Sequence, residues 1–207
     1  PRFEFRAFAQ GFGRVAERIR GAAECEEISE LREAYLVSAT ESAWWHNVKI
    51  RGGLLDIKEL IEKRGVLERW KPVEKHELPL PAEFVRGTLA PSLGVAAGET
   101  GNEPFSLQDV GRRLIDPRRG TAAAVVEKRR FRFQIDTCPV EIDELRINGA
   151  SIESVAVESE DAMAAVNLLS RLGLDDYENV SYPRAVRRIM GLEPMKDGPW
   201  YRFIEVS

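Results

Sequence analysis

The stretch 47–60, NVKIRGGLLDIKEL, limits the possible folds more than any other part of the chain. Apolar and polar residues alternate on both sides of a central Gly-Gly pair, and this period of two is typical of strands with one apolar face. Two glycines reach the positive φ of a two-residue turn without a Cβ clash. The stretch therefore predicts a β-hairpin that carries Lys49, Arg51 and Lys58 opposite its apolar side chains.

Two alternatives remain open for this hairpin. Strands with one wet face alternate in the same way, and the cations would then simply face solvent. Ile57, Leu60 and Ile61 also have helical spacing, so the second strand could pass into a helix by Glu59. If helices cover the apolar face instead, the cations point into whatever the sheet encloses, and that arrangement suits a polyanion.

The composition is that of a globular chain, because 43% of its 207 residues are hydrophobic and 31% are charged. At this length we expect a single domain that spans residues 1–207. The net charge of −4 gives no general attraction for nucleic acid or anionic lipid. No apolar run approaches the ~20 residues of a membrane span and no signal-peptide pattern opens the chain, so we expect a cytoplasmic protein without membrane contact.

Strand and helix signals fall into two groups along the chain. Besides the hairpin we expect strands at 2–8, 32–39, 122–135, 140–145 and 151–158, and helices at 14–20, 106–115, 162–171 and 181–190. The tail 200–206 predicts a closing strand. A proline-rich segment around 65–105 lacks a period and predicts an irregular connection. This order favours an α+β fold with a largely antiparallel sheet.

Cations and carboxylates recur on the polar faces of these strands. Lys128, Arg130 and Arg132 share one face of the strand 122–135, and Phe131 and Phe133 take the other. Triphosphate chemistry needs both charge types, because Arg and Lys neutralise phosphate oxygens and carboxylates hold a divalent metal. The alternative to a phosphate site remains that these are ordinary solvent-exposed strand faces of mixed charge. RNA binding is less favoured, because the aromatic residues share the parity of a core face.

The order of these elements resembles the CYTH superfamily, the triphosphate tunnel metalloenzymes. EFRAF stands where the family has an ExExK strand, and NVKIR, LDIK and EKRRFRF resemble its basic strands. VEIDELRINGASIESVAVESED is similar to its acidic and glutamate strands, and LGLDDYENVSYPRAVRRIMGL to its helical ending. The resemblance implies a tunnel-like antiparallel β-barrel with flanking helices and metal-dependent triphosphatase activity.

The resemblance also implies two groups of site residues. The phosphate-binding candidates are Arg6, Lys49, Arg51, Lys58, Lys128, Arg130 and Arg132. The candidates for Mg²⁺ or Mn²⁺ are Glu4, Asp143 and Glu158. No residue is assigned to catalysis.

The sequence departs from the family pattern at the metal site. Arg6 stands where the second glutamate of the first strand is expected, and Ser154 and Ala156 precede Glu158 where glutamates are expected. Hard cations need several oxygen ligands, so we expect Mg²⁺ or Mn²⁺ to bind weakly. The ligand is expected to be a triphosphate, a polyphosphate or another phosphorylated small molecule, with triphosphatase activity slow or absent. A non-catalytic phosphate-binding role and a purely structural or interaction module remain alternatives.

Overall fold

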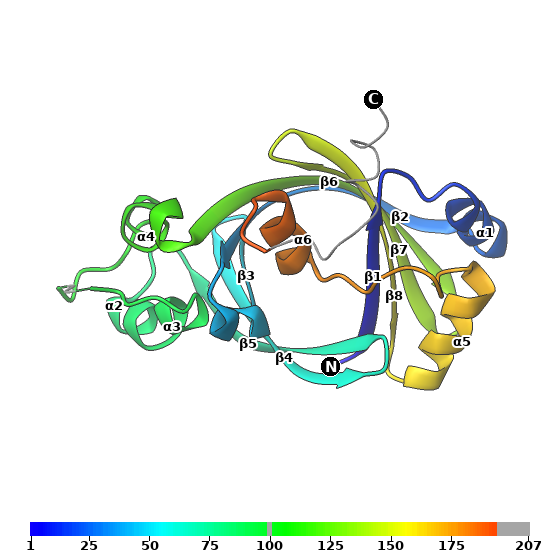
Figure 1. Cartoon of the computed structure of the whole chain (residues 1–207), viewed down its shortest axis with the longest axis horizontal. Helices are drawn as coiled ribbons and strands as arrows, with labels where there is room; N and C mark the ends of the chain where they lie inside the picture. Colours follow the sequence, from blue (N-terminus) through cyan, green and yellow to red (C-terminus); the bar gives the residue numbers. More distant parts are fainter. Residues whose placement is uncertain (99–100, 194–207) are drawn as a thin grey trace, which may run out of the picture.

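The computed structural model describes residues 1–98 and 101–193, and its strands close into a barrel (Figure 1). The strands are β1 Phe3–Ala9, β2 Cys25–Ser38, β3 His46–Arg51, β4 Leu54–Arg64, β5 Leu67–Glu77, β6 Thr121–Ile135, β7 Cys138–Ile147 and β8 Ala150–Ser159. Neighbours are antiparallel in the order β1-β5-β4-β3-β2-β6-β7-β8, and β8 pairs with β1. The predicted antiparallel barrel with flanking helices is confirmed.

Helices flank this barrel at several places. They are α1 Arg14–Ala22, η1 Glu41–Trp45, α2 Ala82–Phe84, η2 Val85–Leu89, α3 Ala90–Ser92, α4 Leu107–Leu114, η3 Pro117–Arg119, α5 Ala162–Leu172 and α6 Tyr182–Ile189. The α4 helix begins with a capping box, in which the Ser106 side chain accepts a hydrogen bond from the Asp109 backbone N–H. Within residues 1–98 and 101–193, no helix has the length and apolarity that crossing a membrane requires.

Two apolar clusters lie on the outer side of the barrel wall. Phe5 and Val157 pack there beneath α1 and α5, and Leu55 and Ile57 pack beneath the short helices of the segment 80–114. Burial of each such side chain contributes about 1.5–3 kcal/mol. Because the apolar face of the β3–β4 hairpin is covered from outside, its cationic face is turned to the barrel interior.

A third cluster lies inside the barrel, and α6 belongs to it. Tyr182 and Val186 of α6 pack against Tyr35, Val126 and Ile147 of the inner wall. Figure 1 shows α6 within the ring of strands. The α6 helix thus fills part of the interior.

The prediction of an irregular connection over 65–105 is wrong for its first part. Residues 67–77 form β5, which pairs with β4 and β1 and is needed to close the barrel. A register shift occurs where Lys58 pairs with Pro72, and a bulge of this kind interrupts the period of two that marks a strand. The alternation of polar and apolar residues therefore did not identify 67–77 as a strand.

Other boundaries differ less. The β2 strand begins at Cys25, well before the predicted start at 32, because its first half pairs along β6 although most of its side chains are exposed. The β4 strand continues to Arg64, so the alternative of a helix near Glu59 is wrong. The predicted strand at 200–206 lies outside the described residues.

Candidate functional site: the interior of the barrel

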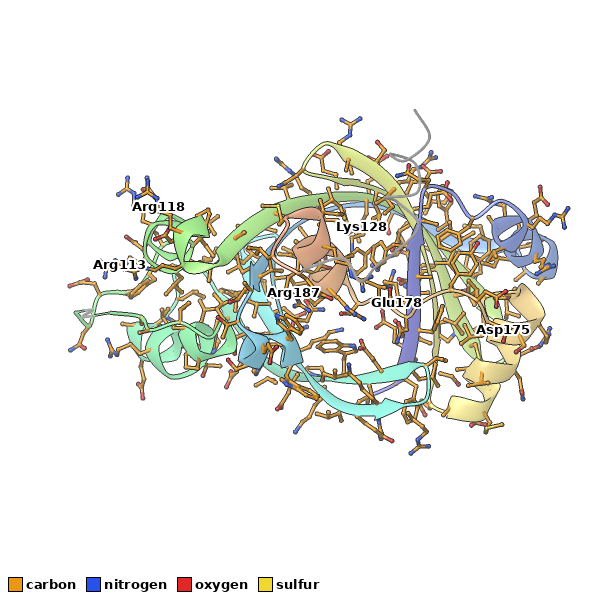
Figure 2. The ribbon with its side chains drawn as sticks, in the orientation of Figure 1. Arg113, Arg118, Lys128, Asp175, Glu178 and Arg187 are labelled. Atoms are coloured by element: carbon orange, nitrogen blue, oxygen red, sulfur yellow. The ribbon has the colours of Figure 1, made fainter. Side chains whose placement is uncertain are left out.

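The strand registers turn a set of charged side chains toward the interior. They include Glu4, Arg6, Glu33, Lys49, Arg51, Asp56, Lys58, Glu68, Lys128, Arg130, Arg132, Glu141, Asp143 and Glu158. Every site residue predicted from the sequence belongs to this set. Arg51 and Arg132 lie near the rim with about half of each side chain exposed, at 48% and 46%. Figure 2 shows side chains from facing walls filling the space inside the ring.

Arg6 lies among three carboxylates of the inner wall. Its Nε donates to Glu4 Oε1 at 2.9 Å, its Nη1 to Asp143 Oδ2 at 2.9 Å and its Nη2 to Glu141 Oε2 at 3.0 Å. Nη1 also lies 3.1 Å from Ser154 Oγ. The guanidinium is nearly fully buried, so these charge-assisted hydrogen bonds replace its lost hydration.

Tyr182 of α6 covers this group of charges. Its Oη donates to Asp143 Oδ2 at 2.5 Å, and its ring centroid lies 4.6 Å from Arg6 Cζ and 4.0 Å from Lys128 Nζ. Burial raises the pKa of Tyr182 well above its usual value, so the phenol stays a neutral donor. Burial also favours protonation of Asp143, but the charges of Arg6 and Lys128 outweigh it and lower the pKa of that carboxyl.

Glu33 on β2 forms a second centre of charge, which sequence reasoning missed. Its carboxylate accepts hydrogen bonds from Lys49 Nζ at 3.1 Å and Tyr35 Oη at 3.1 Å, and it lies 2.7 Å from Lys128 Nζ and 3.4 Å from Arg51 Nη1. Burial raises the pKa of Glu33, but Lys128 and Lys49 outweigh this effect and lower it to about 2. Glu33 therefore stays ionised inside the barrel.

The signal for Glu33 was present in the sequence. In the predicted strand 32–39, Glu33 shares parity with Tyr35 and Val37, so it lies on the same inward face as both. It was missed because the resemblance assigns no charged residue to this strand.

The Glu33–Lys128 pair affects stability in two opposite directions. Burial lowers the pKa of Lys128 to about 8 despite the attraction of Glu33, so burying this ammonium costs stability at neutral pH. The pKa of Glu33 is lowered, so its ionised carboxylate stabilises the folded protein at neutral pH. We expect the stabilising effect of Glu33 to exceed the cost of burying Lys128, because the Glu33 carboxylate contacts Lys49 and Arg51 as well.

Replacing Glu33 with glutamine should therefore remove a part of the stability that depends on pH. A carboxyl whose folded pKa is lowered from 4.5 to about 2 stabilises the fold above pH 4.5 and loses this effect as the pH falls toward 2. We expect the difference in unfolding free energy between wild type and Glu33→Gln to shrink by roughly 3 kcal/mol over that window. Urea unfolding from pH 6 to pH 3 measures the trend.

The control for this experiment is Glu127→Gln. Glu127 forms an exposed ion pair with Arg32 at 3.6 Å, and such pairs contribute little. A Glu33→Gln difference that stays constant across the pH range would contradict our assignment.

Two of the three carboxylates predicted to bind Mg²⁺ or Mn²⁺, Glu4 and Asp143, are already engaged by Arg6. Asp143 Oδ2 accepts from Arg6 and Tyr182, and Arg130 Nε donates to Asp143 Oδ1 at 3.3 Å. Glu4 Oε1 is also engaged by Arg6. Within the described ranges no three His, Cys, Asp or Glu side chains are arranged to hold a metal ion. The Arg6 guanidinium occupies the space among these carboxylates.

Two predicted residues, Glu158 and Lys58, form no ion pair with Arg6 or Glu33. Glu158 pairs with Arg2 at 3.6 Å, and its pKa is raised by burial and by the neighbouring Glu4. Lys58 on β4 makes no ion pair with any described residue. Lys58 is therefore a partly buried interior cation without an ion-pair partner in this part of the chain, and its charge partly offsets the rise in the pKa of Glu158.

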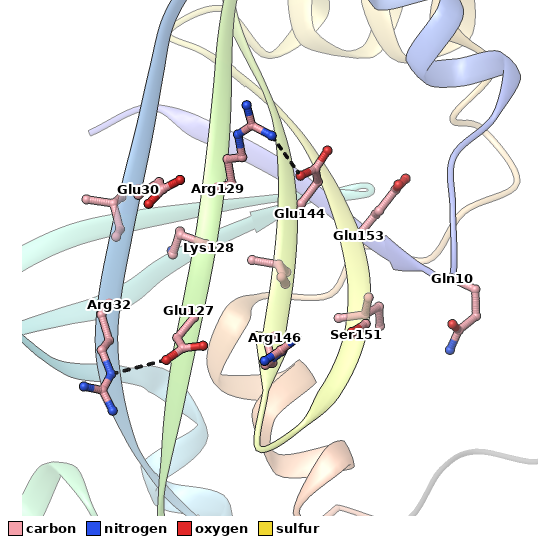
Figure 3. Close-up of a pocket in the computed structure, with 13 residues that line it drawn as sticks. Gln10, Glu30, Arg32, Glu127, Lys128, Arg129, Glu144, Arg146, Ser151 and Glu153 are labelled. Atoms are coloured by element: carbon pink, nitrogen blue, oxygen red, sulfur yellow. Dashed lines mark ion pairs between the residues drawn. The ribbon is translucent and has the colours of Figure 1, made fainter.

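A groove on the outer side of the wall has a different character (Figure 3). Its volume is about 680 Å³, and it runs across β2, β6, β7 and β8. Two cross-strand ion pairs line it, Arg32–Glu127 at 3.6 Å and Arg129–Glu144 at 3.9 Å. Of the predicted site residues only Lys128 borders this groove, and its ammonium is turned inward to Glu33.

Comparison with known proteins bears on the fold. No family model and no curated protein sequence matches the chain. The solved structure of the PH1012 protein from Pyrococcus horikoshii OT3 is similar, with 17% identity and a TM-score of 0.51, over 88% of this chain and 98% of that one. A conserved hypothetical protein from Pyrococcus furiosus has 16% identity and a TM-score of 0.49, over 87% and 98%.

A putative adenylyl cyclase with a dominant triphosphatase activity, from Hippeastrum, has 11% identity and a TM-score of 0.48, over 94% of this chain and 100% of that one. The similarity to PH1012 establishes a shared fold and no more. A closed antiparallel barrel with flanking helices is the architecture that the CYTH resemblance implied. The chain is a closed antiparallel barrel that shares the fold of PH1012.

Proposed function

We propose that the barrel interior binds the phosphate groups of a small molecule, and that it does so without a divalent metal. The ligand is a triphosphate, a polyphosphate or another phosphorylated compound. The observation that carries this proposal is the set of inward cations on three strands: Lys49, Arg51 and Lys58 on β3 and β4, and Arg130 and Arg132 on β6.

Some of these cations are available to a ligand at low cost. Lys58 has no ion pair to break among the described residues, and Arg51 and Arg132 reach solvent at the rim. At ~4 Å and an effective dielectric of ~20, a contact between two unit charges is worth about 4 kcal/mol before desolvation. Arginine can also bind phosphate through two parallel hydrogen bonds.

The position of Arg6 supports binding that is independent of metal. Its guanidinium already neutralises Glu4, Glu141 and Asp143, so a Mg²⁺ or Mn²⁺ ion would have to displace a buried cation. Hydrolysis of a phosphoanhydride in such a site needs a metal that bridges phosphate oxygens and helps to position water. We therefore propose that triphosphatase activity is slow or absent.

A purely structural role for the interior is the second candidate. It is favoured by the ion pairs that Glu33, Glu141 and Asp143 already make with interior cations. A ligand that engaged Lys49 or Arg130 would have to compete with these carboxylates. Ligand binding distinguishes the two candidates.

Inorganic triphosphate should raise the melting temperature of the wild-type protein to the same extent with Mg²⁺ and with EDTA. At 100 times the dissociation constant the stabilisation is about 2.7 kcal/mol. In Lys58→Met most of this shift should be lost, because the variant removes an interior cation without breaking an ion pair. Thermal unfolding monitored by circular dichroism measures the shift.

The matched control is Lys71→Met, which removes an exposed cation from the outer face of β5. It should retain the full shift. A melting temperature that millimolar triphosphate, polyphosphate and nucleotides all leave unchanged would contradict phosphate binding and favour the structural role.

A further inference from the structure

Four inward side chains of the β3–β4 hairpin form a compact array. Lys49 lies opposite Asp56, and Asn47 lies opposite Lys58, in the register of the two strands. Val48, between the two β3 residues, belongs to the outer cluster, so all four side chains share the interior face. Opposed Cβ atoms in such a pair are about 5 Å apart and diagonal ones about 7 Å.

Two buried oxygen atoms in this array have no partner. Asn47 Oδ1 and Asp56 Oδ1 are both removed from solvent and accept no hydrogen bond from any described group. Buried acceptors are almost always satisfied in folded proteins, because leaving one unpaired costs free energy. The facing Lys49 does not satisfy Asp56 Oδ1, since its ammonium donates to Glu33 and makes no hydrogen bond to this oxygen.

The surrounding charges indicate what kind of donor would fit. Asp56 is flanked by Lys49 on β3 and by Lys75 on β5, each opposite it in register. Another cation would be repelled by both lysines. A neutral hydroxyl donates a hydrogen bond to a carboxylate or amide oxygen without adding positive charge.

We propose that the ligand is a phosphate ester whose organic part carries hydroxyl groups. Its phosphate contacts Lys58, and its hydroxyls donate to Asp56 Oδ1 and Asn47 Oδ1. This inference rests on the proposed phosphate binding and narrows its ligand class. Inorganic triphosphate and polyphosphate lack these hydroxyl donors, so they leave both oxygens unsatisfied.

The test compares two probes that differ only in their hydroxyl groups, glycerol 3-phosphate and propyl phosphate. We expect the wild-type protein to bind glycerol 3-phosphate roughly tenfold more tightly by isothermal titration calorimetry, since two added hydrogen bonds account for a ratio of that size. In Asp56→Leu the preference should fall to about threefold or less, while propyl phosphate binds at least as well as before.

Asn47→Leu provides a second, independent variant in case Asp56→Leu fails to fold. The matched control is Glu59→Leu, which changes an exposed outward residue of the same strand and should keep the tenfold preference. Circular dichroism of each unliganded variant checks the fold.

The outcomes separate this inference from the proposal beneath it. Equal affinity for the two probes in the wild-type protein overturns the inference and leaves phosphate binding intact. A preference that survives in both leucine variants also overturns it, because the hydroxyls would then bind elsewhere. If neither probe binds and triphosphate does not bind either, both the inference and the proposed function fail.

Discussion

Arg6→Met should lower the free energy of unfolding by about 3–5 kcal/mol at neutral pH, the usual loss when one partner of a buried ionic group is removed. The guanidinium donates to Glu4, Glu141 and Asp143, and the Asp143 carboxylate has no solvent exposure. Methionine leaves these carboxylates without their cation. For a chain of this size the melting temperature should fall by roughly 10 °C.

The loss should shrink as the pH falls. In the wild type Arg6 helps to lower the pKa of Asp143, so the stability that this carboxyl contributes is present above its unfolded pKa and is lost in acid. In Arg6→Met the pKa of Asp143 should lie higher than in the wild type, because Lys128 and Arg130 remain but the Arg6 charge is lost, so the variant loses less stability in acid. Urea unfolding at pH 7 and pH 4 measures both differences.

The matched control is Arg171→Met, since Arg171 pairs with Asp136 where both side chains are mostly exposed. It should change stability by less than about 1 kcal/mol. If Arg6→Met costs no more than this control, Arg6 does not hold the interior carboxylates together.

Arg6→Glu should convert the interior into a site that depends on metal. The variant replaces the cation among Glu4, Glu141 and Asp143 with another carboxylate, so contacts worth about 4 kcal/mol each at ~4 Å and an effective dielectric of ~20 change from attractive to repulsive. The variant should be strongly destabilised in EDTA and stabilised by Mn²⁺ or Mg²⁺, by about 2.7 kcal/mol at 100 times the dissociation constant. Thermal unfolding with each metal and with EDTA measures this.

Phosphate release from triphosphate should be followed in the same samples from neutral to alkaline pH. We expect little or no metal-dependent release by the wild type and a gain only in Arg6→Glu. The matched control is Arg6→Gln, which removes the positive charge without adding a metal ligand and should respond little to metal. Robust metal-dependent turnover by the natural sequence would show that Arg6 does not exclude the metal.

Local patterns predicted most of the strands and their inward faces. Alternation in 47–60 and in 122–135 places Lys49 and Lys128 on polar faces, and a strand has only two faces to choose from. The capping box at Ser106 and the left-handed glycine after α5, Gly173, likewise act through neighbouring residues. Such signals can be read from the sequence because the physics that produces them is local.

The sequence did not reveal β5 or the pairing inside the barrel. The β5 strand is defined by its pairing with β4 and β1 across a register shift, and the period of two is lost there. Whether Arg6 contacts a phosphate or the carboxylate of Asp143 depends on the barrel order, in which β1 and β7 both pair with β8. The sequence alone determined which charges share one face of a strand. Only the tertiary structure decided which of them neutralise one another, because the energy of an ion pair depends on distance and burial that closure of the barrel sets.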